Sequence, residues 1–278
     1  MYILTENLNF FYKLNKIFTE KKISFKVLTL GSKIPSIASL ILTTSEEIRK
    51  FETKNNNVKF LIYSPETIFD EYILRVLAAY RIEYKEYYSK LTFSIDPGKK
   101  IGLMVFLDNY YFDSYCCYRT EELIEKIVKI MRVFQINNPD LIHVDFKFGR
   151  GVLSITYELV KNIYKIFKSR QNLRVYLIDE SRTSKIKNLN KFKGKKVSKD
   201  EISALILAMR EGIEVTHENY IKIFNQIKSK KLKLNPISKR DIESNNGALF
   251  KIEDIIEKVL SGECSLIESS QLIKNNII

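Results

Sequence analysis

Residues 94–102 read SIDPGKKIG, and this short stretch decides the fold expected for the chain. It predicts a strand over 91–96 that ends in Asp96, a turn over 97–100, and a second strand over 101–107. A carboxylate at the carboxyl end of a strand, with the backbone folding straight back, suits a divalent metal held beside a phosphate. Two more acids, Asp145 and Asp200, are expected in similar settings, so the three acids together suggest one site.

The elements that follow complete an α/β core over residues 89–211. Two short links, 97–100 and 108–109, suit antiparallel hairpins, and the later strands are separated by helices that imply right-handed parallel crossovers. We therefore predict a mixed five-stranded sheet in the order 3-2-1-4-5, flanked by helices. The expected elements are strands 91–96, 101–107 and 110–116, a helix from Thr120, strand 141–146, helix 152–168, strand 173–179 and helix 199–211.

In that strand order, Asp96 and Asp145 lie on neighbouring parallel strands about 4.8 Å apart, at one shared edge of the sheet. Two carboxylates at one edge repel each other and raise one pKa, unless a cation binds between them. Mg²⁺ prefers such oxygen ligands, and two such ions about 4 Å apart stabilise the attacking and leaving oxygens in phosphodiester cleavage. The residues alone therefore favour a metal-dependent nucleic-acid enzyme.

Asp200 is expected on the opening turn of the last helix of the core, where two interpretations compete. Ser198 and Glu201 fit a capping box, in which Asp200 only favours the helix dipole. In the other interpretation, which we prefer, Asp200 is the third acid of the site. Glu180 follows the strand 173–179 and either reaches the same edge as a metal ligand or has a structural role in the turn.

Two further parts flank the core. Residues 1–88 predict a small α/β domain without a chemical motif, and residues 212–278 predict a lysine-rich helical tail. The tail either covers the core, dimerises or contacts a partner. The expected elements of these parts are helix 8–18, strands 24–30, 39–43 and 58–64, a helix beginning near Thr44, helix 65–80, and a helical pair over 252–260 and 266–273.

Composition narrows the function classes. The net charge is +13, which suits a protein that binds a polyanion such as nucleic acid. The same charge also fits a protein that contacts anionic membranes, or a basic protein without a polyanionic partner. Two histidines and three cysteines without a CxxC pattern argue against a zinc site or a histidine-centred triad and favour reduced thiols inside the cell. No signal peptide opens the chain and no apolar run approaches about 20 residues, so we expect a cytoplasmic, nucleoid-associated protein without a membrane span.

Four motifs, in this order, resemble the RNase H-like superfamily, and above all RuvC-type Holliday-junction resolvases and their YqgF-type relatives. SIDPGKKIGLMVF resembles the first-strand motif, and LIHVDF stands where the family places its second acid, often Glu, so Asp145 differs in type. IDESRTS resembles the segment after strand five of YqgF-type members, with departures at Ser181 and Arg182. SKDEISALILAM resembles the final helix, where Asp200 matches one acid and Ser203 replaces another. The likeness covers residues 91–211.

The resemblance implies a Mg²⁺- or Mn²⁺-dependent endonuclease that hydrolyses phosphodiester bonds in branched DNA, such as a Holliday junction in recombination and repair. It implies that Asp96, Asp145 and Asp200 are catalytic and hold the metal together with Glu180, with a metal-bound water as the nucleophile. Resolvases of this kind usually act as symmetric dimers, so a homodimer is compatible with the resemblance.

A basic loop leaves the fifth strand at the proposed catalytic edge and contains no acid between Arg182 and Lys199. It either clamps backbone phosphates without reading sequence or is a solvated surface loop, and its position favours binding. Further cations near the other strand ends extend the patch. The expected nucleic-acid ligands are Lys99, Lys100, Lys147, Arg150, Arg182, Lys185, Lys187, Lys191, Lys193, Lys195 and Lys196.

Two other functions compete with the nuclease. In an actin-like or sugar-kinase-like ATPase, residues 96–98 would be a phosphate loop, but such proteins need a second matching core and a Gly-rich adenosine site. With nine glycines, the chain offers no such pair of motifs. The missing fourth acid also allows a catalytically inactive scaffold that binds DNA or protein. Loss of metal-dependent cleavage in an Asp96→Asn protein would exclude the scaffold.

Overall fold

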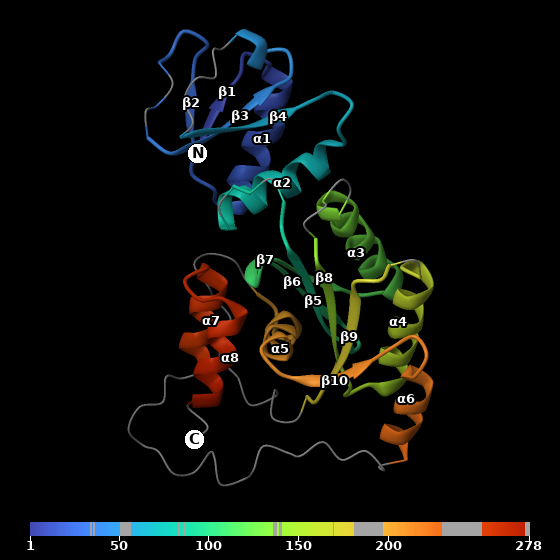
Figure 1. The fold of residues 1–278 in the computed structure, drawn as a ribbon. Coiled ribbons are helices and arrows are strands. Elements are labelled where there is room, and N and C mark those ends of the chain that lie inside the picture. The colour runs from blue at the N-terminus through green and yellow to red at the C-terminus, as the bar shows by residue number, and fades with distance from the viewer. Residues whose placement is uncertain are drawn as a thin grey trace. The chain divides into compact units, whose positions relative to one another are not determined.

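The structure, a computed structural model, describes residues 1–33, 35, 37–50, 57–82, 84–85, 87–135, 138, 141–168, 170–180, 197–229 and 252–275. The chain divides into two compact units, Met1–Glu86 and Tyr87–Ile278. Both units are α/β, and the described residues contain two sheets and eight α-helices (Figure 1). Within these ranges, the helices are too short or too polar to cross a bilayer.

The first unit is built on a parallel sheet of four strands in the order β2-β1-β3-β4. Its elements are β1 (Tyr2–Leu4), α1 (Leu8–Lys21), β2 (Lys26–Leu28), β3 (Ser39–Thr44), the 3₁₀ turn η1 (Ile48–Lys50), β4 (Val58–Tyr63) and α2 (Phe69–Ile82). The Asn7 side chain caps α1 by accepting a hydrogen bond from the Phe10 amide. Phe10 stacks on Tyr63 and contacts Tyr72 of α2, so aromatic packing joins both helices to β4.

Two features of this unit differ from the sequence-based expectation. The sequence did not predict β1, because three residues are too few to show a strand periodicity. The helix expected from Thr44 is a 3₁₀ turn over Ile48–Lys50, and the residues that would extend it, 51–56, lie outside the described ranges. Thr44 instead donates its hydroxyl hydrogen bond to the buried Glu47 carboxylate.

The second unit contains a mixed sheet of six strands in the order β10-β9-β8-β5-β6-β7. Five strands were predicted; the sixth, β10, was missed and pairs antiparallel with β9. β5, β6 and β7 form an antiparallel meander, while β8 and β9 run parallel to β5. The elements are β5 (Lys90–Asp96), β6 (Ile101–Leu107), β7 (Tyr110–Cys117), α3 (Thr120–Gln135), β8 (His143–Gly149), α4 (Leu153–Ile166), β9 (Leu173–Ile178), α5 (Lys199–Ala208), β10 (Gly212–Val215), α6 (Tyr220–Lys228), α7 (Ile252–Ser261) and α8 (Leu266–Asn275).

The hairpin between β6 and β7 has the two-residue turn that the sequence predicted. Asp108 and Asn109 both have positive φ, 48° and 71°, as a type I′ turn requires. The Asp108 carboxylate also accepts hydrogen bonds from the backbone amides of Ser89 and Lys90, at 2.8 and 3.0 Å. The turn is thereby tied to the first residue of β5.

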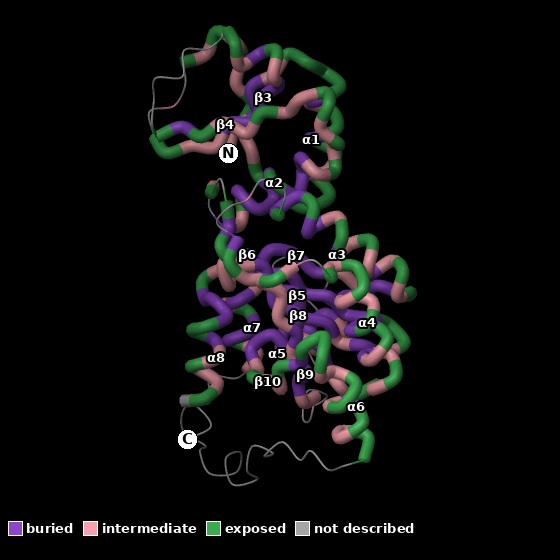
Figure 2. The backbone as a smooth tube through the Cα atoms, turned by 45° about the vertical axis from the view of Figure 1, so that its right-hand side comes forward, coloured by how far each residue is buried: buried purple, intermediate pink, exposed green. Residues whose placement is uncertain are grey.

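The six-stranded sheet is covered on both faces (Figure 1). On one face, α5 is apolar on almost all sides and packs between the sheet and the helical pair α7–α8. On the other face, Phe134 of α3 packs edge-on against Phe112 of β7, and Phe167 after α4 stacks near Phe146 of β8. The central strands β5, β6 and β8 are consequently buried along most of their length (Figure 2).

The helical pair of the tail belongs to the second unit. Ile256 and Val259 of α7 are fully buried in one core cluster with Leu205 of α5 and Phe106 of β6. The structure therefore joins to the core the segment that the sequence set apart as residues 212–278. Of the three roles considered for this tail, the described helices cover the core.

Candidate functional site

Asp96 ends β5 on the face of the sheet that α5 covers. Two residues earlier, the Ser94 hydroxyl donates a 2.6 Å hydrogen bond to the Ala204 carbonyl of α5. Because side chains alternate along a strand, Asp96 shares this face with Ser94. The sheet therefore directs Asp96 toward the amino-terminal half of α5, where Asp200 and Ser203 lie.

A close backbone contact places the first turn of α5 on the hairpin that follows Asp96. Gly102 is the register partner of Asp96, and a β-carbon on Gly102 would lie 2.0 Å from the Asp200 carbonyl oxygen. Only glycine allows the two backbones to approach this closely. Gly102 thus explains why Asp200 comes to the edge where β5 ends.

Two other acids act on Asp96 at this edge. The pKa of Asp96 is raised to about 7, mainly by burial and then by the negative charges of Glu180 and Asp200. A hydrogen bond from Ser203 and the charge of Lys199 lower the pKa by smaller amounts. The carboxylates of Glu180 and Asp200 are therefore close enough to Asp96 to oppose its ionisation.

Glu180 lies just beyond β9 in a space made by two glycines at the end of β8. Its carboxylate accepts a 2.7 Å hydrogen bond from the Gly151 amide. A β-carbon on Gly149 or Gly151 would lie 2.1 or 2.0 Å from the Glu180 carboxylate oxygens. Burial raises the pKa of Glu180, although the Gly151 amide and the charges of Arg210 and Arg150 lower it. The two glycines were not predicted from the sequence as part of the site, although GRG after a strand is a signal for such a space.

Two arginines surround the backbone next to Glu180. Arg150 forms an ion pair with Asp179, with 3.0 Å between Nη2 and Oδ2. Arg210 donates a 2.7 Å hydrogen bond to the Asp179 carbonyl. Arg150, predicted as a phosphate ligand, is thus engaged by a carboxylate in this structure.

The capping box predicted at the start of α5 is present. The Ser198 hydroxyl accepts a hydrogen bond from the Glu201 amide, and the Glu201 carboxylate accepts a 2.8 Å bond from the Ser198 amide. Glu201 therefore stabilises the helix end, as expected. Asp200 is on the same turn and interacts with Asp96.

The structure does not bring Asp145 to Asp96. The sequence predicted that the fourth strand ends near Asp145, but β8 continues to Gly149, because Phe146 and Phe148 pair and pack as core residues. Asp145 is the register partner of Thr92, four residues before Asp96, or about 13 Å along the strand. Its catalytic and metal-binding assignments are therefore not supported by its position.

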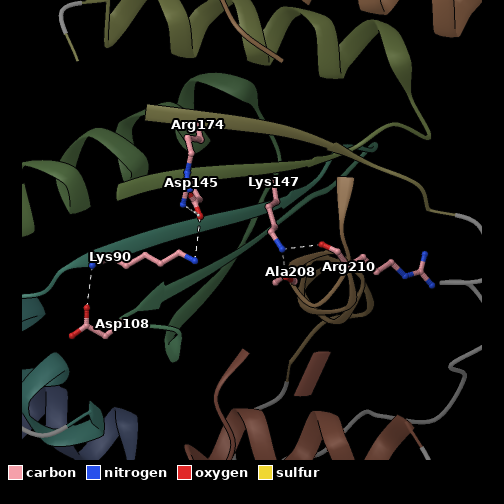
Figure 3. Close-up of polar contacts among 7 residues, drawn as sticks. All are labelled: Lys90, Asp108, Asp145, Lys147, Arg174, Ala208 and Arg210. Carbon is pink, nitrogen blue, oxygen red and sulfur yellow. Dashed lines mark hydrogen bonds and ion pairs between the residues drawn. The ribbon is translucent and has the colours of Figure 1, made fainter. Parts of the chain in front are cut away.

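Asp145 is instead the buried centre of an ion network with two partly exposed cations (Figure 3). The Arg174 guanidinium donates two hydrogen bonds to it, Nε to Oδ1 at 2.8 Å and Nη2 to Oδ2 at 3.0 Å. The Lys90 ammonium lies 3.3 Å from Oδ2. This carboxylate is already neutralised by two cations, which leaves no electrostatic demand for a metal.

Lys147, predicted as a nucleic-acid ligand, caps the carboxyl end of α5 instead. Its ammonium donates hydrogen bonds to the carbonyls of Ala208 and Arg210 (Figure 3). Burial lowers the pKa of Lys147 to about 8, with the nearby Lys90 charge acting in the same direction. A side chain committed to two carbonyls inside the fold is not placed to meet a phosphate backbone.

The other predicted nucleic-acid ligands divide into two groups. Lys99 and Lys100 are exposed on the turn between β5 and β6, next to Asp96. The Lys100 ammonium lies 5.3 Å from the centroid of the Tyr118 ring. The remaining cations lie outside the described residues and stay predictions: Arg182, Lys185, Lys187, Lys191, Lys193, Lys195 and Lys196.

Asp96, Glu180 and Asp200 match a divalent cation in donor type and in charge, because carboxylate oxygens are ligands that Mg²⁺ prefers. The glycine-lined space around Glu180 is a cradle that any larger residue would fill. Among the described residues, however, no group of three or more His, Cys, Asp or Glu side chains is arranged to hold an ion. Asp96, Glu180 and Asp200 are thus the residues that could bind a metal, with Glu180 bonded to Gly151 in this structure.

Comparisons with known proteins give no family for this chain. Neither a protein-family description nor a curated protein matches its sequence. Among solved structures, Marinitoga piezophila Argonaute in complex with a 5′ OH guide RNA and target DNA matches 68% of this chain with a TM-score of 0.27 and 11% identity. The chain spans 40% of the length of that Argonaute.

Two structures of the Aquifex aeolicus member of the Ppx/GppA protein family, one of them described as the Ppx/GppA phosphatase, are also similar at a low level. One, the type II variant, has a TM-score of 0.13 and 12% identity over 70% of this chain and 68% of its own. The other has a TM-score of 0.14 and 13% identity over 82% of both chains. Likenesses of this size do not define a function, so the geometry of the site carries the functional argument.

Proposed function

We propose that residues 87–278 form an RNase H-like, metal-dependent endonuclease. The antiparallel meander β5–β6–β7, followed by parallel β8 and β9 and by α5 against the sheet, supports this fold. The resemblance of residues 94–102 to the RuvC and YqgF first-strand motif supports the same core. Asp96 lies in that motif, and the remaining acids of the proposed site come from the end of β9 and the start of α5.

The observation that carries the proposal is the contact between the β5–β6 hairpin and the first turn of α5, where Gly102 lets the Asp200 backbone approach the end of β5. There, burial and two neighbouring acids hold the pKa of Asp96 at about 7, so its carboxyl group is only partly ionised at neutral pH and a bound cation would favour the ionised form. Such a strongly perturbed group at the carboxyl edge of an α/β sheet is typical of a functional site. Structural acids are usually paired, as Asp145 is with Arg174 and Lys90.

The proposed cofactor is Mg²⁺ or Mn²⁺, held by Asp96, Glu180 and Asp200. When bound, the metal would activate a water and neutralise charge on the phosphate. The protein's own residues have separate tasks. Ser203 orients Asp96 by a hydrogen bond, Gly102 brings Asp200 to the edge, and the Gly151 amide holds Glu180.

We propose nucleic acid as the substrate, and branched DNA such as a Holliday junction as its first candidate form. The net charge of +13 favours binding to a phosphate backbone. The junction itself is suggested by the resemblance to RuvC-type resolvases, which also suggests a homodimer, a role in recombination and repair, and a nucleoid-associated location.

The test is cleavage of a labelled four-way junction, with a linear duplex of matched sequence as control. Each substrate is incubated with Mg²⁺, Mn²⁺ or EDTA, and with the variants Asp96→Asn, Glu180→Gln and Asp200→Asn. We expect metal-dependent cuts that each variant loses by at least about 100-fold. Asp70→Asn, in the first unit, is the matched control and should cleave like the wild type.

A catalytically inactive scaffold is the second candidate function. Two observations favour it: Glu180 is bonded to Gly151 rather than grouped with the other acids, and Ser203 replaces a fourth acid. Tight junction binding without any cut, in Mg²⁺ and in Mn²⁺, would identify the scaffold. The ATPase alternative has no such support, because the parallel sheet of the first unit does not match the mixed sheet of the second.

A further inference from the structure

An exposed aromatic ring lies at the same end of the sheet as the candidate site. Tyr118 follows β7, whose last residue, Cys117, is the register partner of Ile101. Asp96 is the partner of Gly102, so Tyr118 and Asp96 are two strands apart at one edge, about 10 Å across the sheet. The Tyr118 side chain is 65% exposed, whereas half of the described aromatic residues of this unit are buried.

One cation contacts this ring, and further exposed cations lie on the turns at this end of the sheet. Lys99, Lys100 and Arg119 are exposed on the two neighbouring turns, and the charge of Lys199, exposed at the start of α5, reaches Asp96. The Lys100 ammonium lies 5.3 Å from the ring centroid, a cation–π contact that restricts the ring. We call this surface the Tyr118 platform and define it as Lys99, Lys100, Tyr118, Arg119 and Lys199.

The acid beside the platform is already engaged. The Glu122 carboxylate accepts a 3.0 Å hydrogen bond from the Tyr118 amide and lies 3.7 Å from the Lys126 ammonium. The amide bond fixes the backbone that carries the ring, and the lysine offsets the negative charge. The platform therefore combines exposed cations with an exposed ring whose backbone is held in place.

This combination fits an unpaired nucleotide better than a duplex. Basic side chains contact the phosphates of either form, but an exposed ring can stack only on a base whose face is not covered by its neighbours. Because a stacked strand rises about 3.4 Å per nucleotide, a base on Tyr118 would lie about three nucleotides from the phosphate at Asp96.

We propose that the Tyr118 platform binds a single-stranded segment of nucleic acid next to the bond that is cut, with one base stacked on Tyr118. This inference rests on the proposed nuclease function and names the form of its substrate, a strand that is unpaired beside the cleavage position. Lys99, Lys100, Arg119 and Lys199 bind the phosphates of that strand.

The test uses full-length Asp96→Asn protein in EDTA, so that binding is measured without cleavage. The probe is a single-stranded oligonucleotide of about 12 nucleotides with one 2-aminopurine, a length within the usual site sizes. Stacking on the ring should quench the 2-aminopurine fluorescence at one position of the label. Tyr118→Ala should abolish this quench and weaken binding about 5- to 100-fold, while Tyr118→Phe should keep both.

Matched controls separate the platform from general effects. Tyr110 is an exposed tyrosine at the opposite end of β7, and Tyr110→Ala should change neither quench nor affinity. Lys100→Gln should reduce the slope of log affinity against log salt by about 0.7, whereas Lys165→Gln on α4 should leave it unchanged. Matched duplex should lose less than about twofold in affinity when Tyr118 becomes alanine.

The outcomes distinguish the two proposals. Metal-dependent cleavage by the wild type, together with equal binding and quench in Tyr118→Ala, would overturn the platform and leave the nuclease intact. Absence of both cleavage and nucleic-acid binding in the wild type would overturn the nuclease and the platform with it. A quench lost in Tyr118→Ala and kept in Tyr118→Phe and Tyr110→Ala would support the platform.

Discussion

The Glu180 carboxylate accepts a 2.7 Å hydrogen bond from the Gly151 amide, in a space that a β-carbon on Gly151 would fill. Gly151 thus orients the Glu180 carboxylate through its backbone amide, and it leaves space for that carboxylate because it has no side chain. If Glu180 serves the reaction, a methyl group at position 151 should therefore impair the site even though the acid itself is unchanged.

We expect Gly151→Ala to lower metal-dependent cleavage about 10- to 100-fold, because the methyl group would displace the Glu180 carboxylate from its place. The measurement is initial cleavage rate at saturating Mg²⁺. Gly31→Ala is the control, since a β-carbon there meets nothing within 4 Å. Full activity in Gly151→Ala would show that the position of Glu180 does not matter to the reaction.

We expect Asp96→Asn to stabilise the metal-free protein at alkaline pH. The folded-state pKa of Asp96, about 7, is above its ordinary value of 3.8, so ionisation makes the folded state less stable as the pH rises between these values. After allowance for solvent screening, the amide should add about 2 kcal/mol at pH 8, or about 5 °C in melting temperature.

Thermal unfolding in EDTA at pH 4 and pH 8 measures this effect. The gain should be close to zero at pH 4, where the carboxyl is protonated in the folded protein, and largest at pH 8. Mg²⁺ should raise the melting temperature of the wild type more than that of Asp96→Asn. A variant equally stabilised at both pH values, or an equal response to Mg²⁺, would argue against a strained acid that needs a cation.

Asp145→Ala should destabilise the protein without disabling the site. Removing this carboxylate leaves Arg174 and Lys90 without their buried partner, and we expect a loss of about 3 kcal/mol in the free energy of unfolding. The rate per folded molecule should stay within about threefold of the wild type. Chemical denaturation gives the first quantity and cleavage below the melting temperature gives the second. Loss of cleavage in fully folded Asp145→Ala would restore the sequence-based assignment.

Lys147→Met should change protein stability, whereas Lys99→Gln should change DNA binding. Lys147 bonds to the last carbonyls of α5, so its loss should lower stability by about 1–2 kcal/mol and leave DNA affinity unchanged. Lys99 is exposed beside Asp96, so its loss should spare stability but reduce the salt slope of duplex binding by about 0.9. Fluorescence anisotropy at several salt concentrations, with melting curves, checks both. A shallower salt slope in Lys147→Met would mean that this lysine contacts DNA.

Local patterns predicted the elements that depend on neighbouring residues. The Asp108-Asn109 turn and the Ser198–Glu201 capping box are both present, because each is specified within four residues. The tail helices α7 and α8 also follow their apolar spacing. By contrast, β10 is four residues long and exists by pairing with β9, which no local pattern reveals.

The site was harder to predict, because it depends on the residue at which each strand ends and on the helix residues that pack against the sheet there. Asp96 and Asp200 interact, as their patterns suggested, but Asp145 is displaced because β8 continues through Phe148 to Gly149. Lys147 was read as a surface cation, yet it faces the end of α5, a contact between residues 61 positions apart. Such partners become visible only when the sheet is assembled.

The buried Asp145–Arg174 pair has a consequence for how the chain finds its register. The two residues are direct partners on β8 and β9, and Lys90 binds the same carboxylate from β5. A shift of one residue in either pairing would turn a charge to the opposite, apolar face of the sheet, so the misaligned states are strongly disfavoured. The register of three strands that are far apart in the sequence is thereby fixed. The relative positions of Asp96 at the end of β5 and Glu180 after β9 depend on this register, and so on a charge cluster that takes no part in their chemistry.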